Sequence, residues 1–207
     1  MNKNRIIPEV LLAFILNLFI SGFALSLDLP EKLFHFSSLK TRFIQEKKLK
    51  AFSQILKTEG SLLVLKPSFI LWKADSPVQF TFLVRDQEVT YKDEDMESPK
   101  IFSVKENPAL KESLPLFNLL LCREPKDLEK YFTLSDIRET GKEADLTLVP
   151  KSAGENTLFS LIRVKINREE GKLLRIEFLE DNGDSSTLSF TETELNPSLT
   201  SQDFRLE

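Results

Sequence analysis

The chain has 207 residues, 41% of them hydrophobic, which is enough for one domain with a sizeable core. Its 28 basic residues are scattered and outnumbered by 32 acidic ones, which argues against a nucleic-acid-binding protein. Seventeen phenylalanines stand against two tyrosines and six glycines, so apolar aromatic side chains are unusually abundant.

The N-terminal segment has the order of a secretory signal peptide. Two basic residues precede the apolar run 10–20, and small residues follow that run. The run is about half the ~20 residues that a membrane-spanning helix needs, which argues against a permanent anchor. We therefore expect residues 1–26 to be a signal peptide, cleaved after Ala24 or Ser26, and residues 27–207 to form a single domain.

The single cysteine helps to predict the cellular compartment of the protein. Cys122 has no partner for an internal disulfide, and no cysteine lies near the predicted cleavage point, where a lipid anchor would be attached. An exported chain with neither anchor nor disulfide is predicted to be a soluble protein of a bacterial periplasm.

The first predicted element of the mature chain is a helix. Asp28 can cap a helix, Pro30 suits its first turn, and Glu31 completes a capping box. Apolar residues then recur at helical spacing, at Leu33, Phe36, Leu39 and Phe43. This pattern predicts an amphipathic helix over about 29–47.

After this segment the apolar period changes to two. Alternation in 63–65, 70–72 and 80–84 predicts strands, and Pro67 and Pro77 lie between these runs, where they interrupt no strand. A charged loop follows, and then an apolar stretch that prolines divide into short predicted helices.

Strand patterns return in the last third of the chain. The segments 144–151, 158–167, 172–181 and 185–195 alternate clearly, and the turn sequences REEG and DNGD join the last three of them. Together these elements predict an α+β fold, in which helices cover the concave face of a large, strongly curved antiparallel sheet.

The sequence lacks the residues that most kinds of enzyme active site require. His35 is the only histidine, so His-ligated metal sites and Ser-His-Asp triads are not available. A Cys122–His35 dyad is conceivable, but the LLLC sequence favours a buried, inert thiol. Neither a glycine-rich phosphate loop nor a GxSxG motif is present. We interpret the chain as a binding protein and not an enzyme, with no cofactor and no metal.

The apolar face of the predicted sheet has two interpretations. Helices carrying bulky leucine and phenylalanine side chains could close loosely over it and leave a cavity for acyl chains, whose burial is worth about 0.8 kcal/mol per methylene. An ordinary core filled by Trp72 and the phenylalanines explains the composition equally simply, and composition alone favours it.

The spacing of one block adds a family resemblance. Gly60, Lys66-Pro67, Trp72 and Pro77, preceded by Phe43-Ile44-Gln45, resemble the pattern of the periplasmic outer-membrane lipoprotein carrier family, LolA. LVPK, REEGKLLRIEF and DFRLE resemble later pieces of the same pattern, so that the resemblance covers essentially residues 27–207.

The resemblance implies a half-open antiparallel β-barrel with a helical lid over a hydrophobic cavity. Family members accept acylated lipoproteins from an inner-membrane lipoprotein-releasing ABC transporter and deliver them to an outer-membrane lipoprotein receptor. We expect a monomer with no nucleic-acid partner. The lipid-binding cavity would be lined by these residues, each of which could equally be a core residue: Leu39, Phe43, Leu63, Leu65, Ile70, Trp72, Phe80, Phe82, Phe117 and Leu120.

Two departures from the family pattern leave alternatives open. Lys66 stands where the family has an arginine that holds the lid, so Lys66 is either a lid latch or a solvated strand end. Asp86-Gln87 stands where the family favours Asp-Gly in a hairpin turn. The alternatives are a LolA-like carrier of another amphiphile, such as a glycolipid or polyene lipid, and a periplasmic sensor or scaffold that binds a protein partner.

Overall fold

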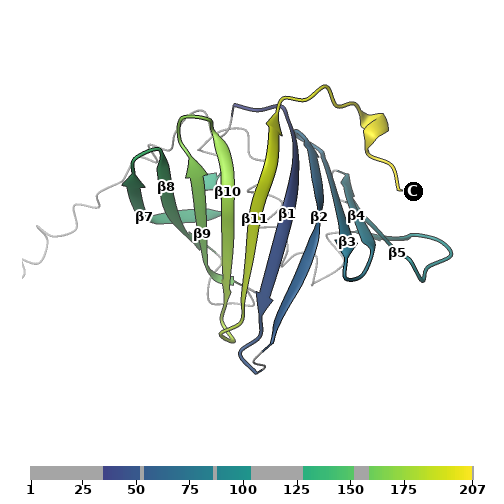
Figure 1. Cartoon of the computed structure of the whole chain (residues 1–207), viewed down its shortest axis with the longest axis horizontal. Helices are drawn as coiled ribbons and strands as arrows, with labels where there is room; N and C mark the ends of the chain where they lie inside the picture. The colour runs from purple at the N-terminus through teal and green to yellow at the C-terminus, as the bar shows by residue number, and fades with distance from the viewer. Residues whose placement is uncertain (1–34, 52–53, 86–87, 104–127, 152–158, 207) are drawn as a thin grey trace, which may run out of the picture.

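The computed structural model describes residues 35–51, 54–85, 88–103, 128–151 and 159–206. These residues form one antiparallel sheet of eleven strands, in the order β6-β5-β4-β3-β2-β1-β11-β10-β9-β8-β7. Figure 1 shows the sheet as a single strongly curved layer with β11 and β1 at its centre. Along the chain, β1 to β6 follow one another from the centre to one edge of the sheet, and β7 to β11 follow one another from the other edge back to the centre.

The strands are long at the centre of the sheet and shorter at one edge. The outward half consists of β1 (Ser38–Lys48), β2 (Ile55–Leu65), β3 (Phe69–Ser76), β4 (Phe80–Arg85), β5 (Glu88–Asp93) and β6 (Lys100–Ser103). The returning half consists of β7 (Phe132–Thr140), β8 (Glu143–Pro150), β9 (Phe159–Asn167), β10 (Lys172–Glu180) and β11 (Ser185–Leu195).

The predicted helix over 29–47 is wrong from Ser38 onward, because β1 occupies this stretch as the central strand between β2 and β11. Leu39 and Phe43 are four residues apart, a spacing that fits one face of a helix and one face of a strand equally well. Thr41, between them, is also buried, at 2% exposure, which fits only a period of two. Pairing on both sides overrides the local helix signal.

The strand predictions of the last third are confirmed. Segments 144–151, 158–167, 172–181 and 185–195 correspond to β8 to β11, and the REEG and DNGD turns connect β9 to β10 and β10 to β11. Gly171 and Gly183 in these turns have positive φ angles, of 66° and 88°, which glycine adopts without strain. Pro67 and Pro77 lie in the connections on either side of β3, as predicted.

The predicted helical lid is not confirmed. Its expected segment falls within residues 104–127, outside the described residues. Within the described part of the chain, helix is limited to residues 128–129 and to the 3-10 turn η2 (Ser201–Asp203). The architecture that the structure supports is therefore a large, curved, open antiparallel sheet.

The main core lies on the concave side of the sheet. Buried side chains of β1 to β5 and of β7 to β11 join in one cluster, which includes Phe43, Trp72, Leu146, Ile162 and Phe190. Side chains from opposite halves of the sheet can meet in this way only on the side toward which the sheet curves. This concave face is the setting of the candidate site.

A second, smaller cluster lies on the outer face. The C-terminal segment after β11 crosses the top of the sheet in Figure 1, toward the side on which β3 and β4 lie. Phe204, fully buried, packs there with Leu71 and Leu83, and its ring centroid is 5.3 Å from that of Phe69. A capping box between Thr200 and Asp203 fixes the turn that carries Phe204.

Candidate functional site: the concave face

The centre of the concave face is an aromatic pair that a glycine makes possible. Phe43 on β1 stands opposite Gly60 on β2, which in turn stands opposite Ala74 on β3. A Cβ atom at Gly60 would collide with the carbonyl oxygen of Lys73 and lie 2.8 Å from Cζ of Phe43. The bare glycine lets the Phe43 ring reach Trp72, with ring centroids 4.4 Å apart. The Phe43, Gly60 and Trp72 positions of the sequence pattern thus have one shared structural explanation.

Trp72 belongs to a row of side chains that runs across the sheet. Thr41, Leu62, Trp72, Phe82 and Tyr91 are successive cross-strand partners on β1 to β5, so all five face the same side. Thr41 and Leu62 are buried and Trp72 is 9% exposed, whereas Phe82 and Tyr91 are half-buried. The row therefore becomes more open toward β5.

The open end of this row is an aromatic cluster, formed by Phe80, Phe82 and Tyr91. Their ring centroids lie 4.8 Å apart for Phe82 and Tyr91, 5.4 Å for Phe80 and Phe82, and 6.2 Å for Phe80 and Tyr91. The Tyr91 hydroxyl donates a 2.8 Å hydrogen bond to Oδ2 of Asp93. Burial, followed by this contact with Asp93, raises the pKa of Tyr91. The cluster thus presents adaptable apolar surface with one polar edge.

The opposite half of the concave face is mostly aliphatic. Ile162, Val164 and Ile166 of β9 are at most 1% exposed, as are Leu146 and Leu148 of β8. Aromatic side chains here are the buried Phe132 of β7, Phe159 and Phe178, whose ring centroids lie 4.8 Å apart, and Phe190, which stands opposite Phe43. This half is closely packed, in contrast to the half-buried aromatic cluster.

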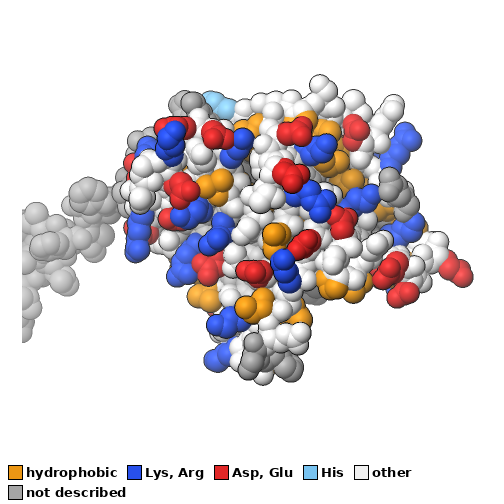
Figure 2. All heavy atoms as spheres, viewed as in Figure 1, with side chains coloured by type: hydrophobic (Ala, Val, Ile, Leu, Met, Phe, Trp, Pro, Cys, Tyr) orange, Lys and Arg blue, Asp and Glu red, His pale blue; other side chains and the backbone are white. Residues whose placement is uncertain are grey.

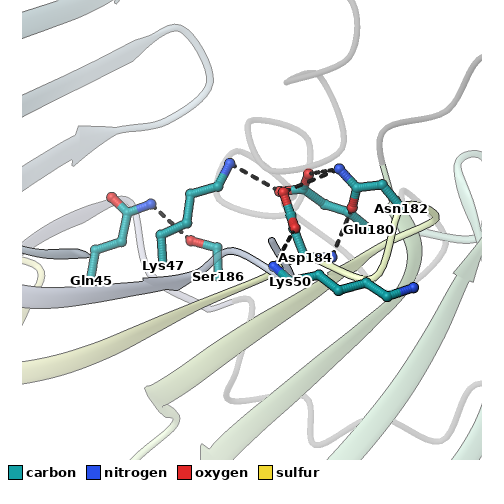
Figure 3. Close-up of polar contacts among 7 residues, drawn as sticks. All are labelled: Gln45, Lys47, Lys50, Glu180, Asn182, Asp184 and Ser186. Carbon is teal, nitrogen blue, oxygen red and sulfur yellow. Dashed lines mark hydrogen bonds and ion pairs between the residues drawn. The ribbon is translucent and has the colours of Figure 1, made fainter. Parts of the chain in front are cut away.

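A polar group closes one end of the concave face (Figure 3). Gln45 and Lys47 follow Phe43 on the same side of β1, and Glu180 follows Phe178 on β10. Lys47 pairs with the largely buried carboxylate of Glu180 at 3.2 Å, and the Gln45 amide donates to the Ser186 hydroxyl at 2.9 Å. These contacts connect β1 to β10 and β11.

The tips of the two neighbouring hairpins are connected beside this polar group. Asn182 Nδ2 lies 3.5 Å from Oε2 of Glu180 and 3.1 Å from Oδ2 of Asp184, and the Lys50 backbone N–H donates to Oδ1 of Asp184 at 2.8 Å. The β1–β2 and β10–β11 hairpins are therefore held together where they leave the core.

The predicted cavity residues divide into three sets. Leu39, Phe43, Ile70, Trp72, Phe80 and Phe82 lie together on the concave face. Leu63 and Leu65 lie on the outer face with Phe204, because their odd-numbered positions on β2 alternate with Leu62 and Val64. Phe117 and Leu120 fall outside the described residues.

Lys66 is engaged at the end of β2. Its Nζ lies 3.7 Å from the centroid of the Phe36 ring, a cation–π contact, and its backbone N–H donates to the Ser37 carbonyl. The lid that a latch at Lys66 would hold is outside the described residues, so the latch stays a prediction.

Sequence reasoning missed six aromatic residues of this face: Phe36, Tyr91, Phe132, Phe159, Phe178 and Phe190. The alternation of β9, β10 and β11 gave the signal that Phe178 and Phe190 point to one side. The pairing of β1 with β11, which brings Phe190 beside Phe43, has no local sequence signal.

Two further features of the described residues bear on the class of protein. No group of three or more His, Cys, Asp or Glu side chains is placed so that it could hold a metal ion in this part of the chain. Nor is any helix there long and apolar enough to cross a membrane. The fold and the face define a curved-sheet protein whose distinguishing surface is an apolar, aromatic concavity.

Comparison with known proteins identifies the family. The chain belongs to the family described as "Outer membrane lipoprotein carrier protein LolA", whose sequence model matches residues 35–207. An outer-membrane lipoprotein carrier protein of Nitrosomonas europaea is 30% identical over 152 residues, covering 73% of this chain and 69% of that protein. One of Pseudomonas fluorescens is 23% identical over 155 residues, covering 75% and 70%.

Solved structures also match. The crystal structure of a LolA superfamily protein from Nitrosomonas europaea has a TM-score of 0.45 and 10% identity, covering 86% of this chain and 94% of that one.

Proposed function

We propose that this protein is a periplasmic carrier that binds the acyl chains of lipoproteins on its concave face. The observation that carries the proposal is the aromatic cluster of Phe80, Phe82 and Tyr91, which continues the row of Trp72 yet stays half-buried. A core that served stability alone would gain by burying these rings completely. Membership of the lipoprotein carrier family supports the same function.

Binding on such a face needs no chemical step. Each methylene that leaves water contributes about 0.8 kcal/mol, so a few acyl chains supply ample affinity. Release then requires a receptor that buries the chains better. The relatives' names as outer-membrane lipoprotein carrier proteins support the direction of transfer. We propose that the protein receives its cargo from an inner-membrane ABC transporter and delivers it to an outer-membrane receptor.

Export is part of the proposal. Residues 1–26 would act as the signal peptide, and residues 27–207 as the carrier domain. The proposed lipid-binding residues are the six predicted ones that share the concave face, joined by Tyr91: Leu39, Phe43, Ile70, Trp72, Phe80 and Phe82.

Native mass spectrometry of the protein purified from a periplasmic extract tests the cargo. The expected result is a bound mass that dissociates to an acylated lipoprotein. A bound glycolipid or polyene lipid would show that the cargo is another amphiphile and not a lipoprotein. A protein that is free of ligand and also refuses added lipoprotein would overturn the carrier function and favour a sensor or scaffold.

A further inference from the structure

The end of the β1–β2 hairpin that contacts the β10–β11 turn pairs lysines with exposed aliphatic side chains. In the last two rungs of this hairpin, Lys48 stands opposite Ile55 and Lys47 opposite Leu56. Ile55 is 54% exposed and Leu56 49% exposed, although both are large aliphatic residues. Each rung thus pairs a lysine with an exposed hydrophobic side chain, one rung on each face of the sheet.

A pocket adjoins this end of the hairpin. It has a volume of about 450 Å³, within the usual range of ligand pockets. Its walls come from residues 54–58, which include the start of β2, from Pro77 and Val78 of the turn before β4, and from Phe80, the first residue of β4. Val78 is also strongly exposed, at 52%. Phe80 belongs to the aromatic cluster, so the pocket leads directly to the open end of the concave face.

The charges at this end are not all neutralised within the protein. Lys47 pairs with Glu180, and Lys57 with Glu59 at 2.6 Å. For Lys48 and Lys50, both exposed, no ion pair is formed with another described residue. In Figure 2, hydrophobic and basic side chains lie side by side at the lower end of the molecule, where Figure 1 places the β1–β2 hairpin. Lys48 therefore places a cation opposite Ile55 of the apolar pocket. The Lys50 side chain lies against Gly183 of the neighbouring β10–β11 turn, where its backbone N–H also donates to Asp184.

We propose that this hairpin end, comprising Lys48, Lys50, Ile55, Leu56 and Val78, docks on the surface of an anionic phospholipid bilayer. The aliphatic side chains enter the boundary between headgroups and acyl chains, and the lysines contact lipid phosphates. The pocket then opens toward the membrane, and an acyl chain reaches Phe80 without crossing water. The inference rests on the proposed function, because it gives that carrier a place at which cargo enters and leaves.

The chemistry favours a bilayer over a protein partner. A protein interface of ordinary strength has a central, well-packed apolar region with few lysines. Here Ile55 and Leu56 each stand opposite a lysine in the last rungs of a hairpin, which suits shallow insertion among charged headgroups.

Flotation with vesicles tests the docking. The purified protein is mixed with vesicles of phosphatidylcholine, with or without phosphatidylglycerol. We expect binding only where phosphatidylglycerol is present, and weaker binding as salt is added. Ile55→Asp should lower binding about tenfold by placing a charge at the insertion point. Lys48→Gln should lower it about fivefold. Both positions are exposed, so circular dichroism should show an unchanged fold.

Ile101→Asp is the matched control, because Ile101 is another exposed aliphatic residue, at 67%, but lies on the edge strand β6. It should bind vesicles like the unchanged protein. Equal losses in Ile101→Asp and Ile55→Asp, or no vesicle binding by the unchanged protein, would overturn the docking surface. So would normal vesicle binding by both Ile55→Asp and Lys48→Gln.

A parallel titration separates this failure from failure of the carrier function. A water-soluble short-chain amphiphile is added without vesicles, and Trp72 fluorescence reports its binding. Amphiphile binding without vesicle binding would remove the docking surface and leave the carrier function standing. Vesicle binding without amphiphile binding would leave the docking surface standing and remove the carrier function.

Discussion

The two faces of this sheet carry apolar clusters of different kinds. On the outer face, the cluster of Leu71, Leu83 and Phe204 is covered by the chain's own C-terminal segment, and Phe204 has no exposed surface. On the concave face, the core is much larger, and it ends in the half-buried rings of Phe80 and Phe82. Both faces arise from the same alternation along β2 to β4. The outer cluster is covered by the C-terminal segment, whereas on the concave face the described chain adds Leu128 and leaves Phe80 and Phe82 half-buried.

This difference separates stability from binding. A cluster with a fixed cover can contribute only to the free energy of folding. A face with half-buried aromatic side chains still has apolar surface to bury, and a ligand can bury it. Substitutions on the two faces should therefore separate loss of stability from loss of ligand binding.

The largest effect is expected from a pair of fully buried phenylalanines. Phe43→Ala on the concave face and Phe204→Ala on the outer face should each lower the free energy of unfolding by about 3–5 kcal/mol. Chemical denaturation measures this loss. Only Phe43→Ala should also alter Trp72 fluorescence and ligand uptake, because its ring contacts Trp72. Equal effects of both substitutions on ligand uptake would contradict the distinction between the faces.

The next effect concerns binding alone. Phe82→Asp places a carboxylate in the half-buried aromatic cluster, which should reduce lipoprotein binding about 10- to 100-fold while the fold is retained. Thr81→Asp is the control, since Thr81 precedes Phe82 on β4 and points to the other face. Calorimetric titration gives both affinities. Normal binding by a folded Phe82→Asp protein would refute the assignment of the cavity.

The polar end of the concave face should matter less. The Glu180 side chain is 9% exposed and its partner Lys47 is 39% exposed, so solvent partly compensates a broken pair. Glu180→Gln should lower the free energy of unfolding by about 1–2 kcal/mol. A double-mutant cycle with Lys47→Met isolates the pair. A coupling energy near zero would show that the contact does not fasten the hairpins.

The smallest effect is expected in acid, on the stability of the C-terminal turn that carries Phe204 on the outer face. Hydrogen bonds from Thr200, first from its backbone N–H, lower the pKa of Asp203 below its ordinary value of 3.8. The lowered pKa stabilises the capped turn above pH 3.8, and this contribution is lost as the pH falls through the folded-state pKa. The protection factors of amides around Phe204, which correct for the slower intrinsic exchange in acid, should therefore fall in acid, and Asp203→Asn should remove that pH dependence. Protection factors that stay constant from neutral pH into acid in the unchanged protein would argue against it.

The sequence predicted the alternating strands of the last third well, since each has an unambiguous period of two and a glycine turn. It failed at β1, where Leu39 and Phe43 fit both periods and only pairing on two sides decides. It also placed Leu63 and Leu65 with Trp72, although cross-strand register puts Leu62 and Val64 beside Trp72 and Ile70.

Register and strand order therefore set the limit of sequence reasoning here. Gly60 was visible as part of a pattern, but its role in admitting the Phe43 ring depends on three strands in register. The pairing of β1 with β11 joins segments about 150 residues apart, and no local pattern encodes it.

Quenching of Trp72 fluorescence by an acyl chain that carries bromine tests the central claim most directly. Trp72 is the only tryptophan and lies at the centre of the concave face. A bound brominated chain should quench it strongly, and Phe82→Asp should abolish the quenching at the same ligand concentration. A brominated amphiphile that binds with full affinity and leaves Trp72 unquenched would contradict acyl-chain binding on the concave face.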